Sequence, residues 1–416
     1  MKIKYQNFIV ICLLIFMGNS CSETTKNSNQ KKSFNHGKYE DILQMGIDRG
    51  FPGFIMAVHT KGEPIWVGAA GFSSLENNKP MQENDRFHLA SVTKLFTSIA
   101  ILQLIDEEKI DFDSPVIKFL DPKLINGIPN IDQITVGQLL DHSSGIYSFN
   151  NDLEYLNTVL GPQAFDGIRW TNEELLQLAN ENRVNPLGEP GSGHYYSDVN
   201  QILLAEIAAK ITEKSFRQVI FERIIKPLHL ENTGFYADTV NREYFDVSIT
   251  VQGYVKRSKA LDDFISIHPS FSEVLSDSVK LLNTTSAVER LDASAGMVST
   301  GGDLTRVGQA LYLGNLVSEK SLNWLYSVGN NIENEAMHTK RQGIVTVRNK
   351  PFGVLYTSLG DGVGGMNTML AYHPESKTVI TAYANIFGNF DEHDFFIDTI
   401  IPQILEADKT GPPKNE

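Results

Sequence analysis

Two strand hairpins, one near each end of the chain, constrain its fold more than any other feature. The first has apolar runs at 53–60 and 65–70 around a Lys-Gly-Glu-Pro turn, and the second has runs at 368–372 and 378–384 around residues 373–377. Because the intervening pattern is mostly helical, we expect the two hairpins to meet in one sheet assembled from both termini. The sequence therefore predicts an α/β (α+β) fold, with an antiparallel sheet, flanking helices and a mostly helical lobe.

No internal repeat or second low-complexity linker interrupts the chain, so residues 38–410 are expected to form one domain. The functional site is expected between the sheet and the helical lobe. Periodic apolar residues predict helices at 91–108, 135–141, 172–182, 198–211, 215–225, 302–313 and 391–406.

The N-terminal residues have the pattern of a secretory signal. Lysines precede an apolar run from Phe8 to Met17, and this run is too short to cross a bilayer, which takes about 20 residues. We expect residues 1–20 to be removed. Cys21 resembles the lipidated cysteine of a bacterial lipoprotein, although Gly18 stands where leucine is usual. Residues 21–37 are polar and are expected to form a flexible, lipidated tether.

These features predict an exported protein, lipid-anchored to a bacterial membrane in the cell envelope and facing the periplasm or the surface. An ordinary secreted protein with an incidental cysteine is the alternative. Cys12 and Cys21 are the only cysteines, so a mature chain would have neither a disulfide nor a thiol metal site. The formal net charge of −14, without a basic cluster, argues against nucleic acid as a partner. Membrane contact is expected through the lipid only.

The run from Phe87 to Ser98 places a serine three residues before a lysine at the start of an apolar helix. Residues three apart share a helix face, so the Lys94 amine can lie beside the Ser91 hydroxyl, and the helix N-terminus favours an oxyanion. A similar spacing at Ser28 and Lys31 lies in a polar stretch and is interpreted as accidental. Ser91 is thus a candidate nucleophile, with a helix-capping serine as the alternative.

A Pro-Gly turn presents Tyr196 and Asp198 just before the next helix. A phenol beside the Lys94 ammonium is expected to favour the phenolate, because an opposite charge lowers its pKa. Such a pair could relay the serine proton. The alternative is a buried structural tyrosine.

The histidines do not indicate a metal site. His142 lies in an Asp-His-Ser-Ser-Gly sequence that invites a Ser/His/Asp interpretation, but a helix-end histidine bonded to the backbone is the preferred one. His194 is a loop histidine that could touch substrate. Since no H-x-x-x-H spacing occurs, neither a metal nor an organic cofactor is expected.

Together these segments resemble the serine beta-lactamase-related family, which includes class C beta-lactamases, D-alanyl-D-alanine carboxypeptidases and lactamase-like esterases. The resemblance covers roughly residues 40–400 and implies a beta-lactamase/transpeptidase-like fold. Ser91-Val92-Thr93-Lys94 matches the family's S-x-x-K motif, and Tyr196-Ser197-Asp198 matches its Tyr-x-Asn or Tyr-x-Asp motif. Further segments that look like the family are 134–145, 227–234 and 295–304.

The family's third motif, Lys-Thr-Gly or His-x-Gly, is altered here. Either Ser358-Leu359-Gly360 or Gly360-Asp361-Gly362 takes its place, and neither contains lysine or histidine. Asp198, Ser358 and Gly360 are the candidate substrate-binding residues. A serine offers only a neutral hydroxyl and Asp361 would repel a carboxylate, so weak handling of penicillins and of peptides ending in a free D-Ala carboxylate is expected.

The resemblance implies a serine hydrolase that acts through a Ser91 acyl-enzyme, with Lys94 and Tyr196 as the general base. The substrate would be a small molecule or peptide: an ester, an amide or a peptidoglycan-type peptide. A catalytically impaired, penicillin-binding-like protein that binds cell-wall peptides or a protein partner is the alternative. The altered third motif favours that alternative, and the intact serine, lysine and tyrosine favour the enzyme.

Overall fold

The structure is a computed structural model of the 416-residue chain. Residues 1–20, which carry the predicted signal, and Cys21 lie outside its described residues, as does the predicted tether up to residue 35. The described residues are 36–152, 154–155, 170–180, 182–236, 246–256, 281–283, 293–314, 316–327, 339–342, 345–362, 364–388 and 391–410.

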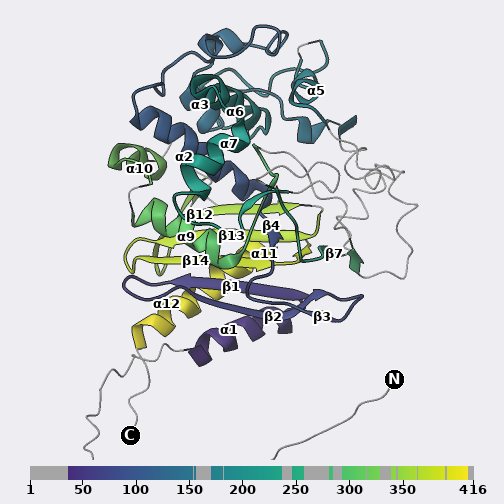
Figure 1. Ribbon diagram of the computed structural model, residues 1–416, viewed down its shortest axis with the longest axis vertical. Helices are drawn as coiled ribbons and strands as arrows, with labels where there is room; N and C mark the ends of the chain where they lie inside the picture. The colour runs from purple at the N-terminus through teal and green to yellow at the C-terminus, as the bar shows by residue number, and fades with distance from the viewer. Residues whose placement is uncertain are drawn as a thin grey trace, which may run out of the picture.

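Among the described residues, eight strands form one antiparallel sheet in the order β10-β11-β12-β13-β14-β1-β2-β3 (Figure 1). Its centre joins the two hairpins, because Ala57 of the first is paired with Thr381 of the second. The predicted sheet built from both termini is thus confirmed. The strands are β1 (Gly53–His59), β2 (Trp66–Ser74), β3 (Lys79–Pro80), β10 (Thr339–Gln342), β11 (Val345–Lys350), β12 (Gly353–Gly362), β13 (Met366–His373) and β14 (Thr378–Ala384).

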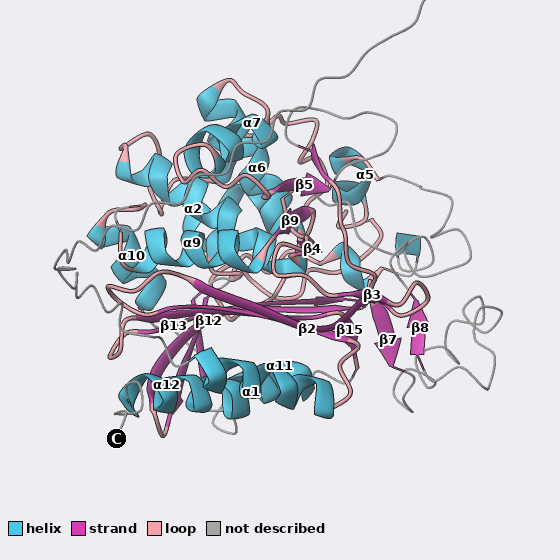
Figure 2. Cartoon of the chain, turned by 60° about the horizontal axis from the view of Figure 1, so that its bottom comes forward, coloured by secondary structure: helices cyan, strands magenta, loops and turns pink. Residues whose placement is uncertain are grey.

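Helices cover both faces of this sheet, so its central strands are buried on both sides (Figure 2). This explains why β1 is apolar at every residue from Phe54 to Val58 instead of alternating. On one face lie α1 (His36–Asp48), α11 (Asp391–Phe395) and α12 (Ile401–Thr410), where Phe54 of β1 stacks on Phe396 with ring centroids 5.6 Å apart. On the other lie α2 (Thr93–Asp106) and α9 (Gly301–Tyr312).

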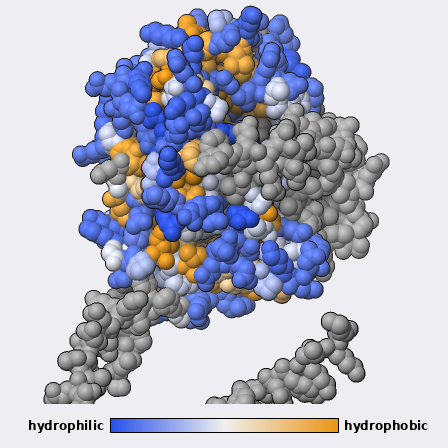
Figure 3. All heavy atoms as spheres, viewed as in Figure 1, coloured by the Kyte–Doolittle hydropathy of each residue, from blue (hydrophilic) through white to orange (hydrophobic). Residues whose placement is uncertain are grey.

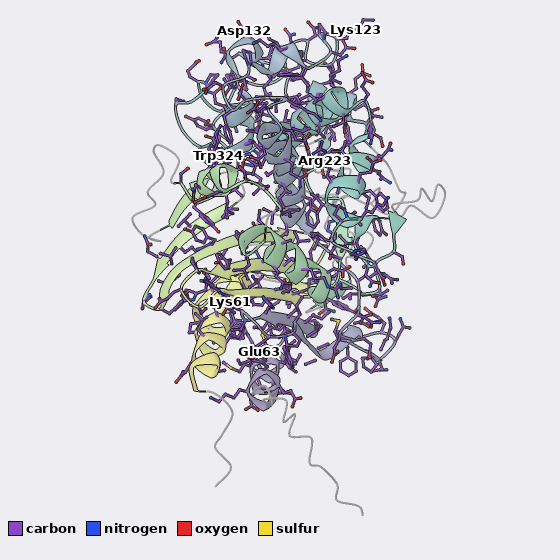
Figure 4. All side chains as sticks on the ribbon, turned by 60° about the vertical axis from the view of Figure 1, so that its left-hand side comes forward. Lys61, Glu63, Lys123, Asp132, Arg223 and Trp324 are labelled. Atoms are coloured by element: carbon purple, nitrogen blue, oxygen red, sulfur yellow. The ribbon has the colours of Figure 1, made fainter. Side chains whose placement is uncertain are left out.

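The helical lobe stands on the second face, around α2. Nearly every side chain of α2 is buried, because neighbouring helices surround it. Trp324 stacks on Phe112 with centroids 4.8 Å apart and ties α10 to this lobe (Figure 4). The other helices are α3 (Val136–Leu140), α5 (Asn172–Gln177), α6 (Val199–Thr212), α7 (Phe216–Ile220) and α10 (Glu319–Tyr326).

Smaller strands connect the lobe to the sheet. They form a sheet in the order β4-β9-β5-β6 and another in the order β15-β7-β8. Through them, the segment before α2 and the segment before α9 lie side by side. The bounds are β4 (Phe87–His88), β5 (Gly234–Tyr236), β6 (Asp246–Val247), β7 (Tyr254–Lys256), β8 (Leu281–Asn283), β9 (Met297–Ser299) and β15 (Ile386–Phe387).

The helices predicted from periodicity are present, with local departures, and the one predicted at 172–182 ends early, at Gln177. The first begins as a 3₁₀ turn over Ala90–Val92. The predicted helices at 215–225 and 391–406 each contain a π-helical turn, Phe221–Ile225 in one and Phe396–Ile400 in the other. No helix in the described part of the chain is long and apolar enough to span a bilayer, and the face in Figure 3 is mostly hydrophilic.

Candidate active site

Ser91 lies where the helical lobe meets the sheet. The backbone leaves β4, makes the 3₁₀ turn and enters α2, and Ala90 in this turn has a left-handed φ of 45°. A residue with a β-carbon rarely adopts that conformation, so the surrounding contacts must hold it. One of them is the hydrogen bond from Leu89 N–H to the carbonyl of Met297, 2.8 Å. The turn leaves Ser91 partly exposed at the N-terminal end of α2.

Lys94 is buried, with 1% of its side chain exposed, and its ammonium has three oxygen partners. Nζ lies 3.0 Å from Ser91 Oγ, 2.9 Å from the carbonyl oxygen of Ser294 and 2.6 Å from Asp198 Oδ1. An ammonium group has three N–H donors, so these contacts hold the nitrogen beside the serine hydroxyl. Burial opposes the charge most strongly, but Asp198 and Tyr196 outweigh burial and raise the pKa of Lys94 well above its usual range.

Asp198 precedes α6 and is itself anchored by a loop from 148 to 150. Its Oδ2 accepts hydrogen bonds from Asn150 Nδ2 and, at 3.4 Å, from Ser148 Oγ. The Asp198 backbone N–H donates to the same Ser148 oxygen at 3.2 Å. Sequence reasoning missed Ser148, Asn150 and Ser294, because no motif contains them and Ser294 contributes only its main-chain carbonyl.

Tyr196 places its hydroxyl 2.9 Å from Ser91 Oγ. The residue is 37% exposed, so the alternative of a buried structural tyrosine is wrong. Burial of the hydroxyl end raises the pKa of Tyr196 most, Asp198 raises it further, and Lys94 opposes both. The expected preference for phenolate is therefore also wrong, because burial, together with Asp198, outweighs the nearby Lys94 ammonium that was to favour it. At neutral pH the resting site contains a phenol and an ammonium.

His142 follows α3 and is fully buried. Its Nδ1 accepts the backbone N–H of Ser197 at 3.1 Å, which agrees with a helix-end histidine bonded to the backbone. The neighbouring Asp141 carboxylate accepts a hydrogen bond from the Ser143 hydroxyl at 2.6 Å. The Asp-His-Ser-Ser-Gly segment therefore does not form a Ser/His/Asp triad. The ring of His194 lies 5.7 Å from that of His142.

Strand β12 approaches the nucleophile through Gly360. A β-carbon on Gly360 would lie 2.3 Å from the Leu89 carbonyl oxygen and 3.0 Å from Ser91 N, so only glycine fits there without displacement. Gly360 belongs to both possible alignments of the third motif, so either alignment lies beside Ser91. Ser358, two residues earlier on the same face of the strand, is fully buried, and its hydroxyl has no hydrogen-bond partner among the described residues.

Asp361 lies near a histidine from the opposite layer of the molecule. Its carboxylate lies 3.6 Å from Nδ1 of His393 in α11. Burial raises the pKa of Asp361 to about 6, with Glu392 raising it further and Lys94 opposing. Burial also lowers the pKa of His393 to about 4, so this histidine is neutral at pH 7 and does not replace the missing cation.

The described residues contain no group of three or more His, Cys, Asp or Glu side chains that could hold a metal ion. At the site, the Lys94 ammonium contacts the Ser91 hydroxyl and the Asp198 carboxylate, and the Tyr196 phenol contacts the same hydroxyl. Once Lys94 or Tyr196 has lost a proton, this arrangement can take a proton from the serine, as covalent catalysis by an activated nucleophile requires.

The model of the family described as Beta-lactamase matches residues 37–398. The chain belongs to this family. Together with the relatives described next, this membership makes it a serine hydrolase. A beta-lactamase/transpeptidase-like arrangement is also found in solved structures, which confirms the predicted fold class.

Two relatives carry informative names. Penicillin-binding protein 4* of Bacillus subtilis is 24% identical over 336 residues, which cover 81% of this chain and 68% of that one. Teichoic acid D-alanine hydrolase of Staphylococcus aureus is 24% identical over 236 residues, 57% of this chain. The latter match spans 52% of the relative, about half its length.

Among solved structures, a D-stereospecific amidohydrolase from Streptomyces sp. has a TM-score of 0.66 and 25% identity, covering 84% of this chain and 94% of that one. The D-amino acid amidase of Ochrobactrum anthropi SV3 has a TM-score of 0.71 at 21% identity, and the match covers 90% of this chain and 98% of that one. At that identity the second likeness shows the fold alone.

The geometry predicts that Lys94 and Asp198 act as a pair in stability. Lys94→Met leaves a buried carboxylate without its cation and is expected to lower the free energy of unfolding by about 3–5 kcal/mol. The double variant Lys94→Met/Asp198→Leu removes both charges and should recover most of this loss. Chemical denaturation of the three proteins measures it, and a double variant less stable than Lys94→Met would contradict the pairing.

Proposed function

We propose that this protein is an envelope-anchored serine hydrolase that cleaves an ester or amide through a Ser91 acyl-enzyme. One observation carries the proposal: Ser91 Oγ lies 3.0 Å from Lys94 Nζ and 2.9 Å from the Tyr196 hydroxyl. Both groups can exchange a proton with the serine, and both lie within the distance that general base catalysis requires.

In the resting site Lys94 is an ammonium and Tyr196 is a phenol, so neither can accept a proton. Acylation therefore requires this pair to lose one proton first. When the Lys94–Tyr196 pair has lost a proton, it accepts the proton of Ser91 as Oγ bonds to the acyl carbon. The carbonyl electrons move to the oxygen, and the resulting oxyanion then expels the leaving group, which takes the proton from the pair. Water repeats these steps on the acyl-enzyme and releases the acid.

The oxyanion would be held between the nucleophile and β12. Ser91 N–H is at the N-terminal end of α2, where the helix dipole favours negative charge, and Gly360 brings the β12 backbone against it. Backbone N–H groups aimed at a developing oxyanion typically contribute about 2.7–4 kcal/mol each. The absence of a side chain at Gly360 leaves room for this approach.

The charges of the site favour a substrate without a carboxylate near the scissile bond. Lys94 is neutralised by Asp198, and neither alignment of the third motif supplies a lysine or a histidine. A substrate with a neutral acyl group, or with an ammonium group, does not need a cation in the site. The named relatives include a D-alanine hydrolase and a D-amino acid amidase, so D-aminoacyl esters and amides are the first substrates to assay.

The anchoring part of the proposal depends on the N-terminal sequence, in which small residues precede Cys21. Cys21→Ala should abolish incorporation of labelled palmitate in bacterial cells and move the protein from the membrane to the soluble fraction. Cys12 lies in the apolar run, and Cys12→Ala serves as the control. Palmitate labelling of the Cys21→Ala protein would contradict the assignment.

The nucleophile is tested by intact mass after exposure of the 38–416 protein to a fluorophosphonate and, separately, to a penicillin. The fluorophosphonate should add one label to the wild type and none to Ser91→Ala, because only a serine activated by Lys94 and Tyr196 reacts. Penicillin should label slowly or not at all. Ser215→Ala, which removes a helix-capping serine of α7, should label like the wild type. An unlabelled wild type would instead support the impaired, peptide-binding alternative.

The raised pKa values of Lys94 and Tyr196 predict that hydrolysis becomes faster as the pH rises. The rate of ester hydrolysis, as kcat/KM, should rise with pH from 6 and still rise at about pH 9, because the pair must lose a proton to act. Asp198 raises the pKa of both Lys94 and Tyr196, so Asp198→Asn should move this limb to lower pH. The control is Asp303→Asn, which removes a buried carboxylate outside the site. If the alkaline rise of kcat/KM occurs at the same pH in Asp198→Asn as in the wild type, the proposed effect of Asp198 on these two pKa values is refuted.

A further inference from the structure

His142 is connected to the segment around Tyr196 by three contacts that the proposed mechanism does not use. Its carbonyl accepts the backbone N–H of Tyr195 at 2.6 Å, and its Nδ1 accepts that of Ser197 at 3.1 Å. Between these two bonds, its ring stacks on that of Tyr196, with centroids 4.6 Å apart and an angle of 21° between the planes. The residues on both sides of the phenol are thus attached to one histidine.

Buried hydrogen bonds determine which ring nitrogen of His142 carries a proton. The Ser197 backbone N–H can only donate, so Nδ1 must be the unprotonated acceptor. Asn200 Nδ2 lies 3.1 Å from the same nitrogen, and Asn200 Oδ1 accepts the Ser144 hydroxyl at 2.7 Å. His142, Asn200 and Ser144 are all buried. Buried hydrogen bonds on Nδ1 and on the Asn200 amide hold the ring in one orientation.

The backbone at His142 is also specialised for this position. Its φ of 58° is left-handed, a conformation in which histidine, asparagine and aspartate are enriched. The turn is reinforced by Asp141, whose carboxylate accepts the N–H of Ser143 at 2.9 Å. The chain therefore reverses after α3 in a way that directs the imidazole inward, toward the tyrosine.

We infer that His142 is a positioning residue for the hydrolysis proposed above, holding the Tyr196 hydroxyl at Ser91 Oγ through Nδ1. The inference rests on the proposed function. Support for Tyr196 by His142 matters in this chain because neither alignment of the third motif supplies a cation, and the Ser358 hydroxyl makes no hydrogen bond within the described residues. Tyr196 is more than a third exposed, so its orientation depends on the side that His142 supports.

Two substitutions separate the acceptor from the ring. His142→Asn keeps an acceptor oxygen near the place of Nδ1 and tolerates the left-handed backbone, whereas His142→Phe keeps the ring and removes the acceptor. For a D-aminoacyl aryl ester, kcat of His142→Phe should fall about 100-fold, the scale of a misplaced catalytic group, with KM nearly unchanged. His142→Asn should recover most of kcat. His59→Phe, a buried histidine of β1, should match the wild type.

Hydrogen exchange of the peptides that contain residues 195–198 gives a readout independent of turnover. Exchange there should be faster in His142→Phe than in the wild type or in His142→Asn. If His142→Phe does not fold, Ser144→Ala replaces it: loosening Asn200 should lower kcat about fivefold, the effect of one lost hydrogen bond, and speed the same exchange.

The outcomes are distinct. Wild-type kcat and exchange in His142→Phe would overturn the inference, as would a His142→Asn protein as slow as His142→Phe. If the fluorophosphonate leaves the wild type unlabelled, the proposed function fails, and the exchange rates alone then decide whether His142 positions the tyrosine.

Discussion

The buried ion pair between Lys94 and Asp198 is the interaction on which the rest of the site depends. It joins the first turn of α2 to the start of α6, 2.6 Å apart and removed from water. An unpaired lysine in that place would tend to lose its proton, because burial disfavours charge. The carboxylate keeps the ammonium charged and holds it beside Ser91. Asp198 in turn relies on Ser148 and Asn150, so a loop between α3 and α5 contributes to the protonation state of the site.

The sheet supplies the other half of the arrangement, and its altered motif gives the site its electrostatic character. Gly360 allows β12 to meet the Ser91 backbone, so the geometry for an oxyanion is retained. Neither alignment of the third motif supplies the charge that would attract a substrate carboxylate, and the nearby Asp361 lies 3.6 Å from a neutral His393 on the far side of the sheet. Ser91 thus keeps its contacts with Lys94 and Tyr196 in a site that carries no uncompensated cation, which is the basis for proposing neutral or cationic acyl groups as substrates.

Local patterns were sufficient for much of the fold. The hairpin strands and the helices of the lobe have apolar periodicity strong enough to be recognised, and they occur within a few residues of the predicted bounds. The elements that were missed have weak local signals. Helix α1 begins at His36-Gly37 next to a polar stretch, and β12 ends in Leu-Gly-Asp-Gly, a sequence typical of a turn. Tertiary contacts stabilise both: α1 packs on β1 and β2, and β12 pairs with β11 and β13.

The sequence alone identified the four side chains that meet at the candidate site, because the Ser91–Lys94 spacing follows from helix geometry and the Tyr196–Asp198 turn lies within a few residues. The tertiary structure decided their protonation states and their partners. Whether Tyr196 rests as phenol or phenolate depends on burial and on where the Asp198 carboxylate lies, and Ser294 and Gly360 come from segments about 200 residues or more from the nucleophile. Charge, burial and close backbone approach are long-range properties, so neither motif nor periodicity contained them.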